Sequence, residues 1–451
     1  MSAASDSYSL DPSAIRNPPT SLGGILKRLG PSLILTANVV GSGELVITTS
    51  LGARAGFVCL WVILVACLLK VTVQLEFGKH AINTGETALE SFNRLPGPKP
   101  RGVGWAVWLW FAARVAQFIQ YGGIVGGVAL AMHLAFPAVD VWIWTWLAGI
   151  SAALLVFRGR YRFIQNAAVT LTALFTMFTV FCVVLLQKTP YAVSLADIGQ
   201  GLSFQLPAAA IAVAIAAFSA TGVSADEIMA YPYWCIEKGY ARWTGARDAS
   251  DEWAARAKGW IKVMYWDALL SMVIYTVATA AFYVLGAAIL HGRGEVPQGN
   301  EMIRALSQIY TESYGPGAMV IFLVSAVVVL YSTLFVNCAA TARMVSDGLA
   351  QFGALDFHDD RQRSRWIAIL AWALALFWAA LFLTVRAPAA MIIAGGAGVA
   401  LLLLVVVVAA YHFRYHRLDP RLRPGRLYDV MLWIAFAAIV GVGVKVVVEL
   451  F

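Results

Sequence analysis

The amino-acid sequence predicts an all-α membrane protein of about eleven transmembrane helices. Hydrophobic residues make up 60% of the chain and charged residues only 13%, whereas a soluble domain carries roughly 25% charged residues. The mean hydropathy is +0.73. Apolar runs of about 20 residues, long enough to cross a ~30 Å hydrocarbon core, alternate with short charged loops. The strands of a membrane β-barrel would instead alternate in polarity at every second residue.

The apolar runs give the positions of the expected helices. They lie at roughly 29–53, 56–82, 104–135, 139–156, 163–187, 206–235, 261–290, 316–350, 364–385, 388–412 and 427–449. The segment between the sixth and seventh runs, residues 236–260, holds Trp243, Trp253 and Trp260 among charged residues. This composition predicts an amphipathic helix that lies at the membrane surface.

The distribution of positive charge gives the expected orientation. Most of the 33 lysines and arginines fall in every second loop, which predicts that these loops and the N-terminus are cytoplasmic and that the C-terminus is periplasmic. The expected location is the inner (plasma) membrane of a bacterium. The net charge of +8 therefore reflects topology, and no nucleic-acid partner is expected. The oligomeric state stays open.

The sequence shows no clear motif of a disulfide-bonded, zinc-binding or catalytic protein. The five cysteines lie in or beside apolar segments without CxxC or Cys/His spacing, so neither a disulfide framework nor a zinc site is expected. No HExxH or GxSxG motif falls at membrane depth, and a cleavable signal peptide is not evident. We therefore expect no enzyme and no cofactor. The expected partners are the lipid bilayer and a small ion or small-molecule substrate.

Two segments should interrupt membrane helices. In the first helix, residues 38–44 contain Gly41 and Gly43, each of which weakens a helix by roughly 1 kcal/mol. The same segment ends in Glu44, and a carboxylate at mid-membrane costs about 2.5–3.5 kcal/mol unless it is paired or hydrated. In the sixth helix, residues 219–227 are small and polar and end in Asp226 and Glu227. The alternative is that the glycines only let helices pack closely and that the acids pair with basic residues.

The spacing of the two interruptions predicts an inverted repeat. They lie five helices apart, and because five is odd, the two sets of helices cross the membrane in opposite senses. We expect an N-terminal segment at 1–28, a first five-helix repeat at 29–187, a second, inverted repeat at 188–412 and an additional transmembrane helix in 413–451. Discontinuous helices 1 and 6 would then form a midplane site.

The residues around the first interruption resemble a known family. Gly30-Pro31, Gly41-Ser42-Gly43-Glu44, the run 52–57 and Leu60-Trp61 are similar to the Nramp (natural resistance-associated macrophage protein) family of proton-coupled divalent-metal transporters. Gly126-Gly127 and Tyr331-Ser332-Thr333 extend the similarity over most of the chain. The resemblance implies the fold of the amino acid–polyamine–organocation superfamily, with two inverted five-helix repeats.

The chain departs from the family pattern at the positions that carry its chemistry. The family's metal-binding aspartate and its asparagine in helix 1 fall on Gly41 and Glu44. Its Met-Pro-His-Asn motif falls on residues 223–226, so the thioether that favours soft metals is absent. Its proton-relay acid falls on Gln120, which cannot titrate. The remaining carboxylate, hydroxyl and carbonyl oxygens suit hard cations such as Mg²⁺ or Mn²⁺.

These arguments define the candidate site. The expected substrate- or ion-binding residues are Asn38, Gly41, Ser42, Glu44, Thr221, Gly222, Ser224, Asp226 and Glu227, with Glu44 and Asp226 as metal ligands. The expected coupling or pathway residues are Lys70, Glu76, Arg114, Gln117 and Gln120. Arg114, Gln117 and Gln120 form one polar stripe on helix 3 together with Tyr121, and such a stripe must face the bundle or water.

The sequence thus leads to two hypotheses about function. The first is a secondary active transporter that works by alternating access and moves a hard divalent cation, with proton coupling left open. The second keeps the fold and replaces the cargo with an amino acid or another small organic or anionic solute. It follows from the likeness of Gly41-Ser42-Gly43 to the Gly-Ser-Gly of amino-acid permeases and from Arg114, which could assist an anion.

Overall fold

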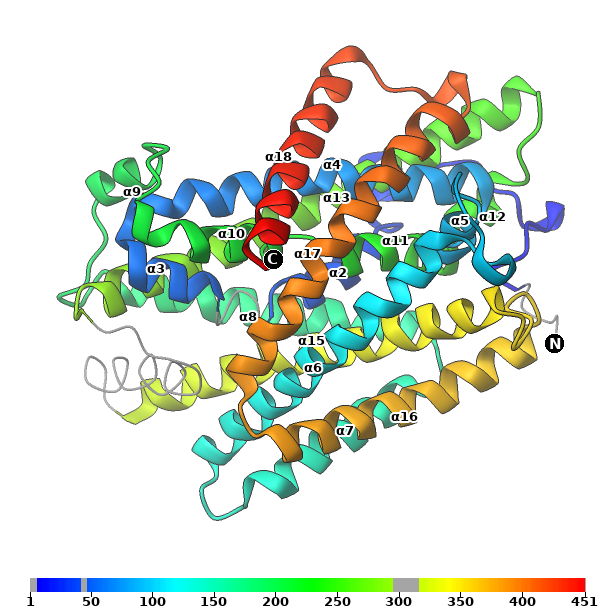
Figure 1. Cartoon of the computed structure of the whole chain (residues 1–451). Helices are drawn as coiled ribbons and strands as arrows, with labels where there is room; N and C mark the ends of the chain where they lie inside the picture. Colours follow the sequence, from blue (N-terminus) through cyan, green and yellow to red (C-terminus); the bar gives the residue numbers. More distant parts are fainter. Residues whose placement is uncertain (1–5, 42–46, 295–315, 451) are drawn as a thin grey trace.

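The computed structural model describes residues 6–41, 47–294 and 316–450, and within these ranges the chain is built from helices without strands. This confirms the predicted all-α fold. Figure 1 shows long helices that run side by side, with α18 crossing over one face of the bundle. By length and apolar composition, eight helices in the described ranges could cross a membrane, and the shorter apolar helix Val141–Val156 accompanies them. Each of the eleven predicted segments contains a helix, while the number of spans stays a prediction.

The helices follow the chain in a simple order. The first half contains α1 (Leu22–Leu26), α2 (Pro31–Val39), α3 (Thr49–Ala55), α4 (Leu60–Thr84), α5 (Ala88–Asn93), α6 (Trp105–Ala135), α7 (Val141–Val156) and α8 (Tyr161–Leu186). The second half contains α9 (Leu195–Gly201), α10 (Ile211–Ala220), α11 (Ala225–Lys238), α12 (Tyr240–Thr244), α13 (Asp251–Leu285) with the π-helical η6 (Gly286–His291), α15 (Pro316–Gln351), α16 (Asp360–Val385), α17 (Pro388–His412) and α18 (Arg426–Leu450).

Both predicted helix interruptions are confirmed. The first helix ends as α2 at Val39 and resumes as α3 at Thr49. The sixth ends as α10 at Ala220 and resumes as α11 at Ala225. In both places small and polar residues take the place of a continuous apolar run, as the sequence indicated.

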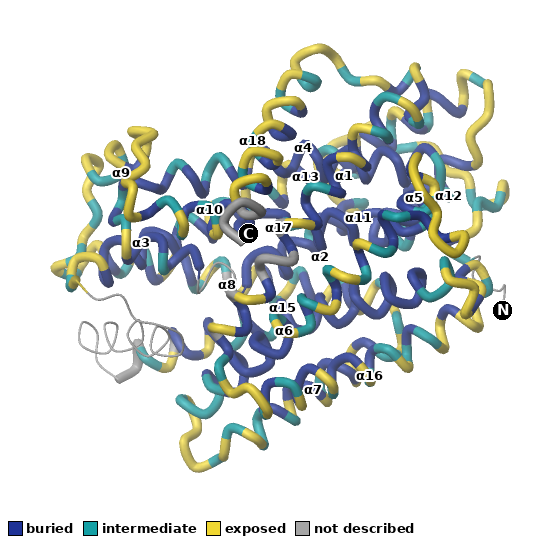
Figure 2. The backbone as a smooth tube through the Cα atoms, in the orientation of Figure 1, coloured by how far each residue is buried: buried dark blue, intermediate teal, exposed yellow. Residues whose placement is uncertain are grey.

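The bundle exposes large apolar side chains on its outside and buries several charged side chains within a mainly apolar core. Exposed large apolar side chains gather on α8 and α18, among them Met177 and Val444, and Figure 2 shows exposed positions along the outer side of α18. The charged side chains of Lys70 and Arg114 are in contrast 0% and 1% exposed. Charged groups in a membrane helix must face the bundle or water because lipid cannot solvate them.

The positively charged loops come together at one end of the bundle. Figure 1 shows the N-terminal end of the described chain, α5 and α12 on this side, and α3 and α9 on the opposite side. Contacts between loops and helix ends here include Arg363–Asp6, Arg417–Glu86, Arg16 N–Trp243 O and Arg421–Ser250 O, and Arg343 of α15 donates to Gly159 O. We call this the N-terminal end. The gathering fits the predicted alternation of the helices, whereas the side of the membrane that this end faces stays a prediction.

The prediction of an amphipathic surface helix at residues 236–260 was wrong. The short α12 is followed by a turn, and α13 then begins at Asp251 and runs without interruption into the membrane-length helix. Trp243, Trp253 and Trp260 are buried. Trp243 packs against Trp260 with ring centroids 4.7 Å apart, and the indole of Trp260 donates to Arg16 O at 2.9 Å. The N-terminal segment therefore covers Trp243 and Trp260, where a lipid surface was expected.

Helix α3 contacts η6 so closely that only glycine fits between them. A Cβ atom on Gly52 would lie 2.5 Å from Tyr283 O and 2.7 Å from Ala287 N, which are backbone atoms. Gly199 on the exposed α9 has no such neighbour within 4 Å. We therefore expect Gly52→Ala to destabilise the protein by about 1–3 kcal/mol through overpacking. Thermal unfolding in detergent measures this, with Gly199→Ala as the control. An equal midpoint for the two variants would contradict the close approach of α3 and η6.

Glu86 links the loop after α4 to the segment before α18 at the N-terminal end. It lies 3.0 Å from His80 Nε2, accepts from Arg417 Nη2 at 2.6 Å and pairs with Arg94. Burial raises the pKa of Glu86, but the hydrogen bond with His80 and the charges of His80, Arg417 and Arg94 outweigh it and lower the pKa to about 2. Because the folded-state pKa is depressed, this contribution to stability is present above the ordinary pKa of 4.5 and is lost as the pH falls toward 2.

We therefore expect Glu86→Gln to lower the unfolding temperature at pH 7 and to flatten its decline between pH 4.5 and pH 2. Thermal unfolding across this pH range, compared with wild type, tests the expectation. Parallel curves for the two proteins would contradict it.

Candidate functional site

The break in the sixth helix is defined by backbone geometry. Thr221 caps the C-terminus of α10 in an extended conformation (φ −85°, ψ 145°), and Gly222 follows with φ +67°. A Cβ at Gly222 would approach Cys67 Cα of α4 to 3.1 Å, so glycine suits this position both for its conformation and for its size. Ser224 then caps α11, and its side chain and that of Glu227 form a reciprocal capping box.

Lys70 satisfies the open end of α10. Its Nζ donates to Phe218 O at 2.8 Å, to Ser219 O at 3.3 Å and to Thr221 O. The last carbonyls of a helix carry partial negative charge, and in a broken membrane helix such carbonyls can coordinate a cation. Here the lysine ammonium of α4 makes these contacts.

The break in the first helix lies against the same region. Asn38 Nδ2 at the end of α2 donates to Glu227 Oε1 at 2.6 Å and to Asn337 Oδ1 of α15 at 3.2 Å. A Cβ at Gly41 would collide with Thr333 Oγ1, also of α15. Beyond the break, Thr48 Oγ1 lies 3.2 Å from Thr221 Oγ1. The two interruptions are therefore in contact with each other. The predicted site residues Ser42 and Glu44 lie outside the described residues.

A buried ion pair joins α11, which follows the break in the sixth helix, to α6. Arg114 of α6 donates to Asp226 from Nη2 to Oδ1 at 2.6 Å and from Nη1 to Oδ2 at 3.2 Å. The hydroxyl of Tyr121 donates to Asp226 Oδ2 at 2.7 Å and accepts from Arg114 Nη1 at 2.7 Å. Both charged side chains are more than nine-tenths buried. Such a two-point contact between guanidinium and carboxylate is among the strongest and most directional of hydrogen-bonded pairs.

Several buried polar atoms near the breaks have no hydrogen-bond partner among the described residues. They are Asn38 Oδ1, both amide atoms of Gln117 and Arg114 Nε. Buried polar atoms are nearly always paired, and each of these belongs to a side chain that contacts the breaks or shares the helix face of Arg114. These atoms therefore offer hydrogen-bonding capacity for a small polar ligand or for water.

Two of the predicted pathway residues lie elsewhere. Glu76 forms an ion pair with Lys79, whose ammonium lies 4.2 Å from the ring centroid of Tyr428 on α18. Gln120 packs its backbone against Gly395 of α17 and is half-buried. Lys70 and Glu76 therefore belong to different clusters, in agreement with their spacing of six positions, which places them on different helix faces.

The charges at the breaks limit what can bind there. Asp226 is neutralised by Arg114, while Glu227 pairs with no lysine or arginine among the described residues and accepts from Ser224 and Asn38. In the described ranges, no group of three or more His, Cys, Asp or Glu could hold a metal ion. Among the described residues at the breaks, Glu227 is therefore the carboxylate without a basic partner, and amide and carbonyl oxygens surround it.

The N-terminal end of the site is closed by residues that the sequence did not single out as a unit. Asp267 of α13 accepts from Gly30 N at 2.7 Å and from Ser32 N at 2.6 Å, and so caps α2 from a neighbouring helix. Arg343 of α15 makes a two-point contact with Glu237 at the end of α11. A charged residue near a helix end was visible in the sequence, but its partner on a distant helix was not.

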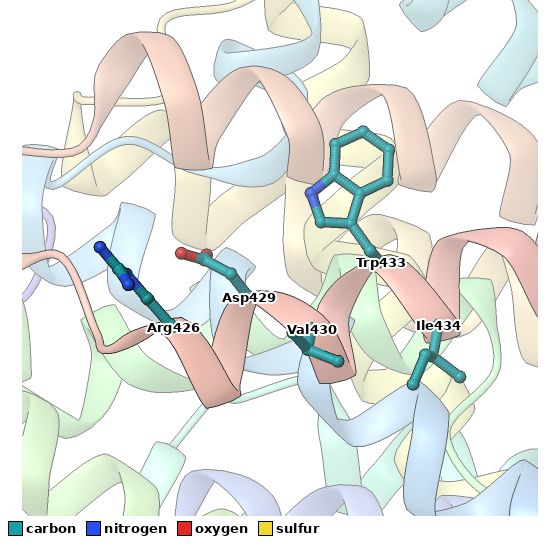
Figure 3. Close-up of a pocket in the computed structure, with 5 residues that line it drawn as sticks. All are labelled: Arg426, Asp429, Val430, Trp433 and Ile434. Carbon is teal, nitrogen blue, oxygen red and sulfur yellow. The ribbon is translucent and has the colours of Figure 1, made fainter.

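A surface hollow on α18 is separate from the breaks. It has a volume of about 570 Å³ and is lined by Arg426, Asp429, Val430, Trp433 and Ile434. Figure 3 shows these side chains along the one helix. Asp429 forms an ion pair with Arg414, whose Nη2 donates to its carboxylate at 2.8 Å. None of the residues at the helix breaks lines this hollow.

The chain is similar in sequence to a known family and to individual members of it. The profile of the natural resistance-associated macrophage protein-like (Nramp) family matches residues 32–449. The divalent metal cation transporter MntH of Mycobacterium tuberculosis is 27% identical over 272 residues, which are 59% of this chain and 58% of that protein. This chain therefore matches less than two thirds of the length of that curated relative.

Solved structures share the arrangement of helices. A variant of the manganese transporter of Eremococcus coleocola superposes with a TM-score of 0.70 at 14% identity, covering 95% of this chain and 88% of that one. The nucleobase-cation-symport-1 family transporter Mhp1 superposes with a TM-score of 0.57 at 16% identity, covering 97% and 95%. At these identities the likeness concerns the fold alone.

We expect the buried ion pair to make single substitutions costly. Asp226→Asn leaves the Arg114 guanidinium buried without its counter-charge, so the free energy of unfolding should fall by about 3–5 kcal/mol. Adding Arg114→Met should restore part of this loss because no charge is then left unpaired. Thermal unfolding of the two single variants and the double variant measures the coupling.

Asp360, which pairs with Arg363, supplies the control, since its side chain is 71% exposed and Arg363 keeps Asp6 as a second partner. Asp360→Asn should change the free energy of unfolding by less than about 1 kcal/mol. Additive effects of the Asp226 and Arg114 substitutions would contradict direct pairing.

Proposed function

Because the chain belongs to the natural resistance-associated macrophage protein-like (Nramp) family, we propose that it is a secondary active transporter that moves a hard divalent cation across a membrane by alternating access. The single observation that carries the proposal is the meeting of two interrupted helices beside buried polar atoms that have no hydrogen-bond partner in the described part of the chain. In lipid, backbone that leaves a helix is tolerated where it is buried in protein or lines a cavity. Interrupted helices of this kind form the midplane sites of secondary transporters.

The choice of a divalent cation rests on relatives and on ligand chemistry. The Mycobacterium tuberculosis relative is named a divalent metal cation transporter, and the Eremococcus coleocola protein with the same fold a manganese transporter. The oxygens near the breaks, from Asn38, Ser224 and Glu227, suit Mg²⁺ or Mn²⁺ better than a soft metal. Glu44, from the sequence alone, is the further carboxylate in this proposal. Mg²⁺ keeps several of its waters, so few direct protein ligands are needed.

Proton coupling and topology extend the same proposal. Glu227 is the proposed proton carrier because it accepts hydrogen bonds from Ser224 and Asn38 without a fixed counter-charge, whereas Asp226 is held by Arg114. The N-terminal end of the bundle would face the cytoplasm of a bacterial cell, since its loops carry most of the positive charge. In the described conformation this end is closed by the contacts of Asp267 and Arg343, so opening of this end would accompany release of the cargo inward.

A second candidate cargo is favoured by the two fixed cations. Arg114 and Lys70 both lie at the break in the sixth helix, and positive side chains there favour a small organic or inorganic anion such as a carboxylate. Both cations are engaged by protein oxygens in the described conformation, which makes the anion the weaker of the two candidates. A carboxylate cargo would have to displace Asp226 from Arg114.

Uptake into proteoliposomes tests the two cargoes. Wild-type protein should transport Mn²⁺ or Mg²⁺ down an imposed gradient, and Glu44→Gln and Glu227→Gln should each lower the initial rate by tenfold or more, because a ligand carboxylate is lost. Glu252→Gln, an exposed acid at the start of α13, is the matched control and should leave the rate unchanged. Saturable uptake of an amino acid or carboxylate without divalent-cation flux would replace the first cargo by the second. Divalent-cation flux that neither acid substitution affects would overturn the proposed site.

A further inference from the structure

A basic pocket lies at the N-terminal end, apart from the helix breaks. It has a volume of about 620 Å³, and its lining contains seven lysines and arginines but a single acid, Glu237. The seven come from five segments: the N-terminal stretch, the end of α1, the start of α8, the end of α11 and α12. Many chain segments therefore direct positive charge into one hollow.

The single acid does not neutralise this charge. Both carboxylate oxygens of Glu237 accept from Arg343, at 2.6 and 3.0 Å, and the hydroxyl of Tyr8 donates to the same group at 2.8 Å. In the described part of the chain, no carboxylate forms an ion pair with the pocket residues Arg16, Lys27, Arg28, Arg160 and Arg162. A hollow with this surplus of positive charge attracts an anion.

The pocket is built by specific contacts. The guanidinium carbons of Arg28 and Arg16 lie 5.2 and 5.8 Å from the ring centroid of the buried Trp243. Lys238 Nζ donates to Leu29 O at 2.6 Å and to Gln165 Oε1 at 2.9 Å. Burial lowers the pKa of Arg242, and the neighbouring Arg16 lowers it further. These contacts keep like charges close together.

The position of the pocket indicates the source of the anion. Arg160 and Arg162 flank the first residue of α8, and Lys238 is the last residue of α11. The pocket therefore lies at the ends of apolar helices, the level at which we expect lipid headgroups. Directly after Arg162, Phe163 begins an exposed apolar side of α8 that continues to Met177 and Val184. On the other side, Leu22 and Leu26 of α1 are 58% and 52% exposed and share one helix face at i and i+4.

We propose that this pocket binds the phosphate headgroup of an anionic glycerophospholipid whose acyl chains lie against the exposed side of α8. Basic pockets between membrane helices at the positively charged end recognise such headgroups. The exposed leucines of α1 would lie among the acyl chains, and Lys27 would contact the headgroup. The lipid would thereby bridge the N-terminal segment, α8 and α11. This proposal is independent of the cargo and of the helix breaks.

Lipid titration of the purified protein tests the proposal. Wild-type protein in phosphatidylcholine nanodiscs should gain thermal stability as phosphatidylglycerol or cardiolipin is added, and native mass spectrometry should detect retained anionic lipid. In Arg160→Gln/Arg162→Gln, the lipid fraction at half-maximal stabilisation should rise by about tenfold or more, because each basic residue near the surface contributes to lipid binding. Arg158→Gln/Arg361→Gln removes the same charge from exposed residues outside the pocket and should change this fraction less than about twofold.

Two further arms complete the test. Inorganic phosphate should not stabilise wild-type protein in phosphatidylcholine alone. Lys27→Gln, at an exposed position of the pocket, should also weaken the lipid effect, and it leaves α8 unchanged. Equal lipid dependence of the pocket variants and the control variant would overturn the proposal. Stabilisation by inorganic phosphate alone that matches the effect of lipid would identify a free anion as the ligand and would equally overturn it.

Discussion

The ion pair between Arg114 and Asp226 is the interaction on which the centre of this protein depends. Two opposite charges lie deep in an apolar bundle, and each would be strongly destabilising without the other. Their two-point contact, completed by the Tyr121 hydroxyl, fixes the start of α11 against α6. The second half of the interrupted helix, α11, is thereby attached to α6. The break is kept in a medium where an uninterrupted helix would otherwise be favoured.

Lys70 stabilises the half of the break that precedes Gly222, as Arg114 stabilises the half that begins with α11. The C-terminal carbonyls of α10 receive its ammonium group, so both halves of the broken helix are stabilised by cations that belong to the protein. Glu227 is the exception, since it is held by Ser224 and Asn38 without a counter-charge among the described residues. Among the described residues of the centre, one carboxylate lacks a basic partner and several amide atoms lack a hydrogen bond. This combination suits the binding and release of a small polar cargo.

Much of the fold could be predicted because lipid imposes simple rules on sequence. The length of the apolar runs predicted the helices, and glycines within a few residues of acids predicted the breaks between 39 and 49 and between 220 and 225. The pairing of side chains could not be predicted in the same way. Arg114 and Asp226 are 112 residues apart, and the polar stripe on α6 indicated that Arg114 faces inward without naming its partner. Gln120 belonged to the predicted stripe, yet it packs against Gly395 of α17. The stripe is long enough to contact more than one neighbouring helix. The tryptophans of residues 236–260 misled for a similar reason, since composition does not distinguish a membrane surface from a covering N-terminal segment.

The most direct test of this account is a distance measurement by solid-state NMR in lipid bilayers, between the guanidinium nitrogens of Arg114 and the carboxyl carbon of Asp226. Dipolar dephasing between ¹⁵N-arginine and ¹³C-aspartate labels, taken as the difference from an Arg114→Gln sample, isolates this pair. The account predicts a separation of roughly 3–4 Å, as two-point hydrogen bonding requires. A difference signal that indicates a separation well beyond hydrogen-bonding distance would contradict it.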